Sequence, residues 1–218
     1  NNIRELAWLR EEGKKEYFVR GTITRYNLDF AADVISLADS GIRSISLEPV
    51  LSCPDKEYAL TEELLPAVFE EYEKLAGIMA ERRKSKKNDF RFYHFEMDVY
   101  NGPCVYKRLT GCGAGWEYLS VTPDGSVYPC HQFNENDDFL MGNIFDGGID
   151  MDISRRFAGN HIYSRKECGS CWARYYCSGG CHAGNYKYAG GIGKPYEMSC
   201  RLQKKRIECA LYVQAQLV

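Results

Sequence analysis

Hydrophobic positions in the first fifty residues alternate between the spacing of strands and the spacing of a helix. Residues 17–24 are rich in β-branched and aromatic side chains, and residues 30–38 carry apolar side chains at helical spacing. Gly41 is placed to end this helix, and residues 42–50 predict a second strand that ends near a proline. Because the connections are short, we expect a βαβ unit with parallel strands and a right-handed crossover.

Two further helices are predicted on either side of this unit. Apolar side chains at positions 3–9 mark the end of an amphipathic helix. Thr61 is placed to cap a long helix, with Glu62 and Glu63 near its positive end. The basic run at 82–87 is interpreted as the solvated end of this helix. Its apolar stripe is interpreted as core packing and consists of Leu65, Val68, Phe69, Tyr72, Leu75, Ala76 and Met79.

From Cys104 onward the composition shifts towards glycine, tyrosine and cysteine. Residues 118–129 predict a β-hairpin with an Asp-Gly turn at 124–125. Residues 168–200 lack the regular apolar pattern that a core of their own requires. We therefore expect bound metal to hold this segment together.

Composition and charge exclude several classes of partner. The chain has 218 residues, 44% of them hydrophobic, which is enough for one or two domains with a sizeable core. A formal net charge of -2 gives no electrostatic basis for binding nucleic acid or an anionic membrane surface. Because the sequence has neither a signal peptide nor an apolar run long enough to cross a bilayer, a cytoplasmic protein is expected.

The 10 cysteines are the most informative feature of the composition. In a cytoplasmic chain of this size, clustered thiols are more often metal ligands than disulfides. Four thiolates satisfy either one tetrahedral zinc ion or one [4Fe–4S] cluster, so seven ordered cysteines nearly fill two sites. These seven have the spacing Cys112-x12-Gly125-x4-Cys130, then Cys168-x2-Cys171-x5-Cys177-x3-Cys181-x18-Cys200.

This spacing resembles the seven-cysteine SPASM signature of radical SAM enzymes. That group includes anaerobic sulfatase maturases and enzymes that modify ribosomal peptides. Short sequence motifs make the chain most similar to maturases of SCIFF peptides (six cysteines in forty-five residues), which install thioether crosslinks. These motifs are residues 20–27, 46–50, 111–115, 121–125, 128–133 and 141–144.

The resemblance implies an α/β fold class with two domains. Residues 1–99 would be the C-terminal portion of a partial (β/α)6 radical SAM barrel, in which the strand at 17–24 is similar to the fifth barrel strand and that at 42–50 to the sixth. Residues 100–218 would form a small cysteine-rich SPASM iron–sulfur domain that contains the β-hairpin.

The resemblance also implies a ligand set for two auxiliary [4Fe–4S] clusters. The first cluster would be held by Cys112, Cys130 and Cys181, and the second by Cys168, Cys171, Cys177 and Cys200. The fourth ligand of the first cluster stays open between Cys104 and an iron left free for a substrate thiolate. Cys53 and Cys209 match no part of the signature and are interpreted as ordinary thiols.

The function implied is formation of thioether links between a cysteine sulfur and an α-carbon in a ribosomally made peptide. The complete enzyme would use S-adenosylmethionine, a third [4Fe–4S] cluster and an electron donor such as flavodoxin or ferredoxin. On the S-adenosylmethionine side the resemblance points to Arg20, Thr22 and Val50, and it assigns no catalytic residue. The Cys-x3-Cys-x2-Cys motif that holds the third cluster is absent from this sequence, so the chain alone is expected to be unable to start radical chemistry.

Three alternatives remain open from the sequence. The chain could serve another SPASM maturase, such as an anaerobic sulfatase-maturing enzyme with a different peptide substrate. It could be a zinc-binding module without catalysis, because tetrathiolate zinc uses the same Cys-x2-Cys turn. A simple electron-transfer protein is the least favoured, because it would need no βαβ unit.

Overall fold

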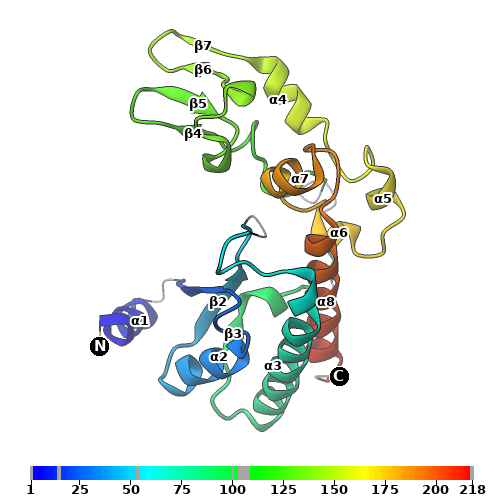
Figure 1. Ribbon diagram of the computed structural model, residues 1–218. Coiled ribbons are helices and arrows are strands. Elements are labelled where there is room, and N and C mark those ends of the chain that lie inside the picture. The colour runs from blue at the N-terminus through cyan, green and yellow to red at the C-terminus, as the bar shows by residue number, and fades with distance from the viewer. Residues whose placement is uncertain (1, 14–15, 53–54, 100, 103–108, 217–218) are drawn as a thin grey trace. The chain divides into compact units, whose positions relative to one another are not determined.

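The computed structural model describes residues 2–13, 16–52, 55–99, 101–102 and 109–216 (Figure 1). The chain divides into two compact units, one of residues 1–101 with 202–218 and the other of residues 102–201. Residues 202–218, expected in the second domain, thus cluster with the first unit. The reason is an apolar helix face on which Leu202, Ile207, Ala210 and Val213 are buried.

The first unit is an α/β structure around a three-stranded parallel sheet. The strand order is β1-β2-β3, and Thr22 on β1 lies opposite Glu48 on β2. The predicted βαβ unit is therefore confirmed. The elements are α1 (Asn2–Glu12), β1 (Val19–Ile23), α2 (Phe30–Asp39), β2 (Ser44–Pro49), η1 (Glu62–Leu64), α3 (Leu65–Ser85), β3 (Arg91–Phe92), η2 (Tyr93–Phe95) and the part of α8 (Glu197–Ala215) that begins at Leu202.

The helix α3 packs through the predicted stripe, of which every member except Phe69 is fully buried. Its start differs from the prediction. Thr61 precedes the 3-10 helix η1, and its side chain makes no capping hydrogen bond. The α-helix begins at Leu65 because Pro66 suits the first turn, where its missing N–H group is not needed.

The helix α1 forms where the apolar spacing predicted a helix. Ile3, Leu6 and Leu9 are exposed, and Ala7 is its buried residue. The apolar side chains of this helix therefore form an exposed apolar surface.

The second unit contains a four-stranded antiparallel sheet in the order β4-β5-β6-β7. The predicted hairpin is confirmed, and Gly125 occupies the left-handed conformation that its turn requires. The Thr122 hydroxyl donates to the Asp124 carboxylate at 2.6 Å and fixes the turn. The elements are β4 (Ser120–Val121), β5 (Ser126–Tyr128), β6 (Gly142–Asn143), β7 (Gly148–Ile149), α4 (Met151–Ala158), α5 (Lys166–Gly169), α6 (Arg174–Cys177) and α7 (His182–Ala189).

An aromatic core stabilises the second unit. The rings of Phe133 and Phe139 lie 4.3 Å apart, and Phe157 meets Phe133 edge to face at 5.5 Å. Ala183 and Ile192, which belong to the segment 168–200, are buried in the same cluster. Apolar packing on residues outside the segment therefore contributes to its stability, in addition to the metal expected from the sequence.

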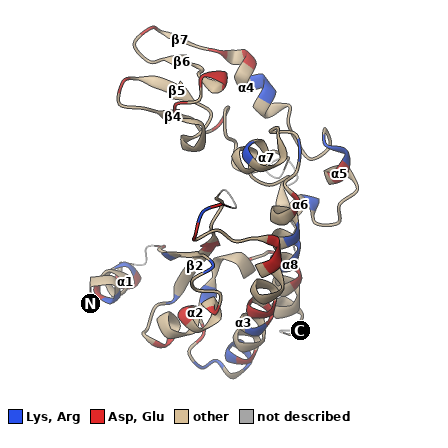
Figure 2. Cartoon of the chain, viewed as in Figure 1, with Lys and Arg blue, Asp and Glu red and all other residues tan. Residues whose placement is uncertain are grey.

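The surface of the first unit mixes both signs of charge along α3 and α8 (Figure 2). This pattern agrees with the near-zero net charge of the chain. Within the described residues, none of the helices combines the length and apolar character needed to cross a bilayer.

Candidate metal centre

All seven predicted cluster ligands lie in the second unit. Cys130 and Cys168 are buried, Cys171, Cys177 and Cys200 are half-buried, and Cys112 and Cys181 are exposed. Cys104, the tentative fourth ligand, lies outside the described residues, as does Cys53.

The first group of thiols consists of Cys112, Cys130 and Cys181. Burial raises the pKa of Cys130, and the nearby thiols of Cys181 and Cys112 raise it further. Cys181 caps the N-terminus of α7, where the Gly184 N–H donates to its Sγ at 3.5 Å. The N-terminal end of this helix therefore lies at a sulfur of the group.

The second group includes a tight Cys-x2-Cys turn. The Cys171 N–H donates to the Cys168 carbonyl oxygen at 3.1 Å, which closes the Cys-x2-Cys turn. Burial raises the pKa of Cys177, the N–H groups of Gly179 and Gly180 lower it, and the thiols of Cys168 and Cys171 raise it. The three thiols therefore lie close enough to interact electrostatically.

Arg165 joins Cys200 to this second group. Its guanidinium is buried, with only 3% of the residue exposed. Burial lowers the pKa of Arg165, whereas Cys168, which it also hydrogen-bonds, Cys177 and Cys200 raise it. A buried cation therefore lies beside three of the four cysteines predicted to hold the second cluster.

Neutral oxygens orient this guanidinium. Nε of Arg165 donates to Asn160 Oδ1 at 2.9 Å, and the terminal nitrogens donate to the carbonyl oxygens of Asn160 (3.1 Å) and Gly179. Gly179 has a φ of +83°, and a Cβ at this position would overlap the guanidinium. Glycine is therefore needed both for the turn and for the close approach of Arg165.

The donor set fits an iron–sulfur cluster. Thiolates are the usual ligands of such clusters, and N–H groups aimed at sulfur tune them. Burial raises the pKa of Cys130, Cys168 and Cys177, so metal binding must release protons from these thiols. Among the described residues, no three His, Cys, Asp or Glu side chains are grouped closely enough to hold a single metal ion.

Comparison with known proteins supports this interpretation. Residues 112–172 match the family model of the SPASM iron–sulfur cluster-binding domain. This segment therefore resembles a SPASM domain. The match includes four of the seven cysteines, namely Cys112, Cys130, Cys168 and Cys171. The other three, Cys177, Cys181 and Cys200, follow the matched segment within the second unit.

A curated relative is similar to the present chain over a short segment. The chain is 44% identical over 43 residues to the antilisterial bacteriocin subtilosin biosynthesis protein AlbA of Bacillus subtilis (strain 168). This segment is 20% of the present chain and 9% of AlbA.

The fold of the present chain is similar to that of solved structures. It is similar to anSMEcpe with bound AdoMet, with a TM-score of 0.70 and 18% identity. It is also similar to anSMEcpe with bound AdoMet and the Kp18Cys peptide, with a TM-score of 0.65 and 18% identity. These matches cover 98% of the present chain but 58% and 61% of the two solved chains. The predicted fold class is thereby confirmed.

The residues predicted on the S-adenosylmethionine side lie in the parallel sheet of the first unit. Arg20 and Thr22 are exposed on β1, and the half-buried Val50 follows β2, with its N–H donating to Ile23 O at 2.9 Å. Arg20 is near enough to Glu48 to lower the pKa of that carboxyl. Their contact with S-adenosylmethionine stays a prediction.

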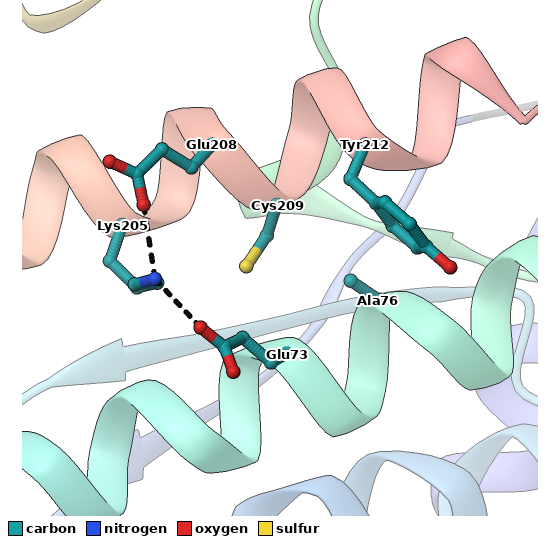
Figure 3. Close-up of a pocket in the computed structure, with 6 residues that line it drawn as sticks. All are labelled: Glu73, Ala76, Lys205, Glu208, Cys209 and Tyr212. Carbon is teal, nitrogen blue, oxygen red and sulfur yellow. Dashed lines mark hydrogen bonds and ion pairs between the residues drawn. The ribbon is translucent and has the colours of Figure 1, made fainter.

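A cavity in the first unit lies between α3 and α8 (Figure 3). Its volume is about 370 Å³, and Lys205 bridges Glu73 (2.8 Å) and Glu208 (3.0 Å) at its edge. Cys209 is buried in its wall. Burial raises the pKa of Cys209 to about 12, so the thiol is protonated at neutral pH.

Sequence reasoning missed two polar arrangements. One is Arg165, and the other is a ring of hydrogen bonds and one close His94–Glu48 contact that links Glu48, His94, Tyr72 and Arg206. Arg165 lies three residues before Cys168, but spacing gave no sign of its burial because arginine is usually exposed. The ring joins residues separated by up to 158 positions, which no local pattern reveals.

Proposed function

We propose that the chain serves a radical SAM peptide maturase, to which it supplies two auxiliary [4Fe–4S] clusters. In this role Cys112, Cys130 and Cys181 hold the first cluster, and the second group of cysteines with Cys200 holds the second. The observation that carries the proposal is the gathering of these thiols into two groups on a SPASM domain. The fold similarity to a protein with bound AdoMet supports it.

The bound clusters would supply one-electron redox capacity and, at an open iron, a place for a substrate thiolate. The chain's own residues then have distinct tasks. The thiols fix the position of each cluster, and the N–H groups of Gly179, Gly180 and Gly184 donate to the sulfurs. The aromatic core keeps both groups on one rigid unit.

We further propose that the reaction is a thioether crosslink between a cysteine sulfur and an α-carbon of a ribosomally made peptide. The local similarity to AlbA, a bacteriocin biosynthesis protein, supports a ribosomal peptide as substrate. The similarity to anSMEcpe with bound peptide supports a peptide substrate more generally, and it favours a sulfatase-type maturase as the alternative.

The cluster proposal is tested by purifying the chain without oxygen and measuring iron, inorganic sulfide and zinc. We expect a brown protein with about eight iron and about eight sulfide per chain, the content of two cubane clusters. The single variants Cys130→Ala and Cys177→Ala should each lose about half of the iron. A colourless protein that contains zinc and no sulfide would show a zinc-stabilised module instead.

The reaction is tested with a radical SAM maturase that contains this chain. It is incubated with S-adenosylmethionine and a reductant, and with either a cysteine-rich precursor peptide or a sulfatase peptide. Loss of two hydrogen atoms per crosslink in the cysteine-rich peptide supports thioether formation. Modification of the sulfatase peptide alone would favour the alternative. Normal crosslinking by a variant with Cys112, Cys130 and Cys181 changed to alanine would refute the role of the first cluster.

A further inference from the structure

Arg165 is buried, and the oxygen atoms that accept its hydrogen bonds are neutral. A buried charge is costly unless an opposite charge lies nearby. In the described part of the chain, the oxygen acceptors of the guanidinium belong to Asn160 and Gly179 and carry no formal charge. The thiols of Cys168, Cys177 and Cys200 lie near the guanidinium, and Cys168 is also its hydrogen-bond partner. The buried guanidinium is therefore placed to stabilise negative charge on these sulfurs.

The position of the guanidinium is fixed by a second layer of hydrogen bonds. The side-chain amide of Asn160 donates to the Ile192 carbonyl oxygen at 2.7 Å. The Asn185 amide donates to the Gly179 carbonyl oxygen at 3.3 Å, the same oxygen that accepts from Arg165. These contacts hold the cation in one place beside the second group of thiols.

We propose that Arg165 is a positioning residue whose buried positive charge raises the reduction potential of the second auxiliary cluster. The inference rests on the proposed function, since it requires a cluster on Cys168, Cys171, Cys177 and Cys200. A [4Fe–4S] centre with four thiolates carries a charge of −2 when oxidised and −3 when reduced by one electron. A fixed cation stabilises the more negative state more strongly, and low-dielectric surroundings strengthen this effect.

The experiment uses the full chain, loaded with clusters without oxygen and titrated with dithionite as the one-electron donor. Electron paramagnetic resonance follows reduction, and the transition that a Cys171→Ala variant loses is assigned to the second cluster. Three variants are compared with the wild type. Arg165→Gln removes the charge, Arg165→Lys keeps it without the planar fork, and Lys166→Gln removes an exposed charge from the next position.

We expect Arg165→Gln to lower the ratio of reduced to oxidised second cluster at least tenfold at a fixed potential, equal to about 59 mV for one electron. Arg165→Lys and Lys166→Gln should stay within about threefold of the wild type, because a buried charge is retained in the first and solvent screens the second. An unchanged potential in an Arg165→Gln protein that holds both clusters overturns the proposal. An equal shift in Lys166→Gln also overturns it.

If Arg165→Gln does not assemble the second cluster, Arg165→Lys shows whether the cluster needs the charge or the planar fork. Assembly in the lysine variant supports the proposal, because the charge is then the property that the cluster needs. Loss of the cluster in both variants overturns it in favour of a purely structural role for the planar fork. If the wild-type chain contains no iron or sulfide, it is the proposed function that fails, and this result is distinct from every outcome above.

Discussion

The Nε2 atom of His94 lies 2.9 Å from Oε1 of Glu48. Nδ1 of the same ring lies 3.0 Å from the Tyr72 hydroxyl, and Arg206 reaches both Tyr72 (3.1 Å) and Glu48 (3.4 Å). Burial lowers the pKa of His94 to about 4, so the ring is neutral at pH 7. Burial alone would raise the pKa of Glu48, but hydrogen bonding to His94 and the charge of Arg206 hold it below its usual value.

This ring of hydrogen bonds should make the first unit sensitive to acid. The unfolded chain protonates His94 near pH 6.5, whereas the folded chain resists protonation until about pH 4. The stability from the neutral ring is therefore complete above pH 6.5 and lost as the pH falls to 4, by roughly 3 kcal/mol. Urea unfolding of wild type and His94→Gln at pH 7, 5.5 and 4 measures this. Equal pH dependence of the two proteins would contradict the role of His94.

The Tyr72 hydroxyl should be important for stability because its loss leaves a buried nitrogen of His94 without a partner. We expect Tyr72→Phe to lower the free energy of unfolding by about 1–3 kcal/mol. Tyr93→Phe is the matched control, since Tyr93 is 54% exposed and its change should cost less than about 0.5 kcal/mol. Circular dichroism during chemical unfolding provides both values. Equal effects of the two changes would argue against the hydrogen-bond ring.

The aromatic core of the second unit should hold even when no metal is bound. We expect Phe139→Ala to lower the free energy of unfolding of the chelated chain by about 3–5 kcal/mol, because a fully buried ring is lost. Phe145→Ala is the control, because Phe145 is 77% exposed, and it should change stability by less than about 0.5 kcal/mol. Absence of a near-ultraviolet dichroism signal in the chelated chain would instead mean that metal alone orders this unit.

Gly179 should be required for the second group of thiols. In Gly179→Ala the new methyl group would overlap the Arg165 guanidinium, and the left-handed φ adds strain. We expect this variant to lose about half of its iron, the share of one of two clusters. Gly169→Ala is the control, because space is open around Gly169 and its φ is ordinary. A full iron content in Gly179→Ala would show that Arg165 need not approach this turn.

The sequence predicted those parts of the molecule that follow local rules. The βαβ unit is visible because strand and helix spacings differ, and the hairpin because Asp124-Gly125 suits its turn. The aromatic core was missed because Phe133, Phe139 and Phe157 come from three separate short elements without a common period. Arg165 was missed for a related reason, since its burial depends on the Gly179 turn folding over it.

The thiol of Cys209 should be unreactive in the folded chain, unlike the exposed thiols of the second unit. It is 4% exposed, and burial raises its pKa to about 12, so the reactive thiolate is scarce at pH 8. In the chelated chain we expect iodoacetamide to modify Cys112 and Cys181 at least tenfold faster, because both are exposed. Mass spectrometry of peptides gives the three rates, and Cys209 should react only after urea is added. Modification of Cys209 at the rate of Cys112 would mean that the cavity between α3 and α8 opens readily to reagents.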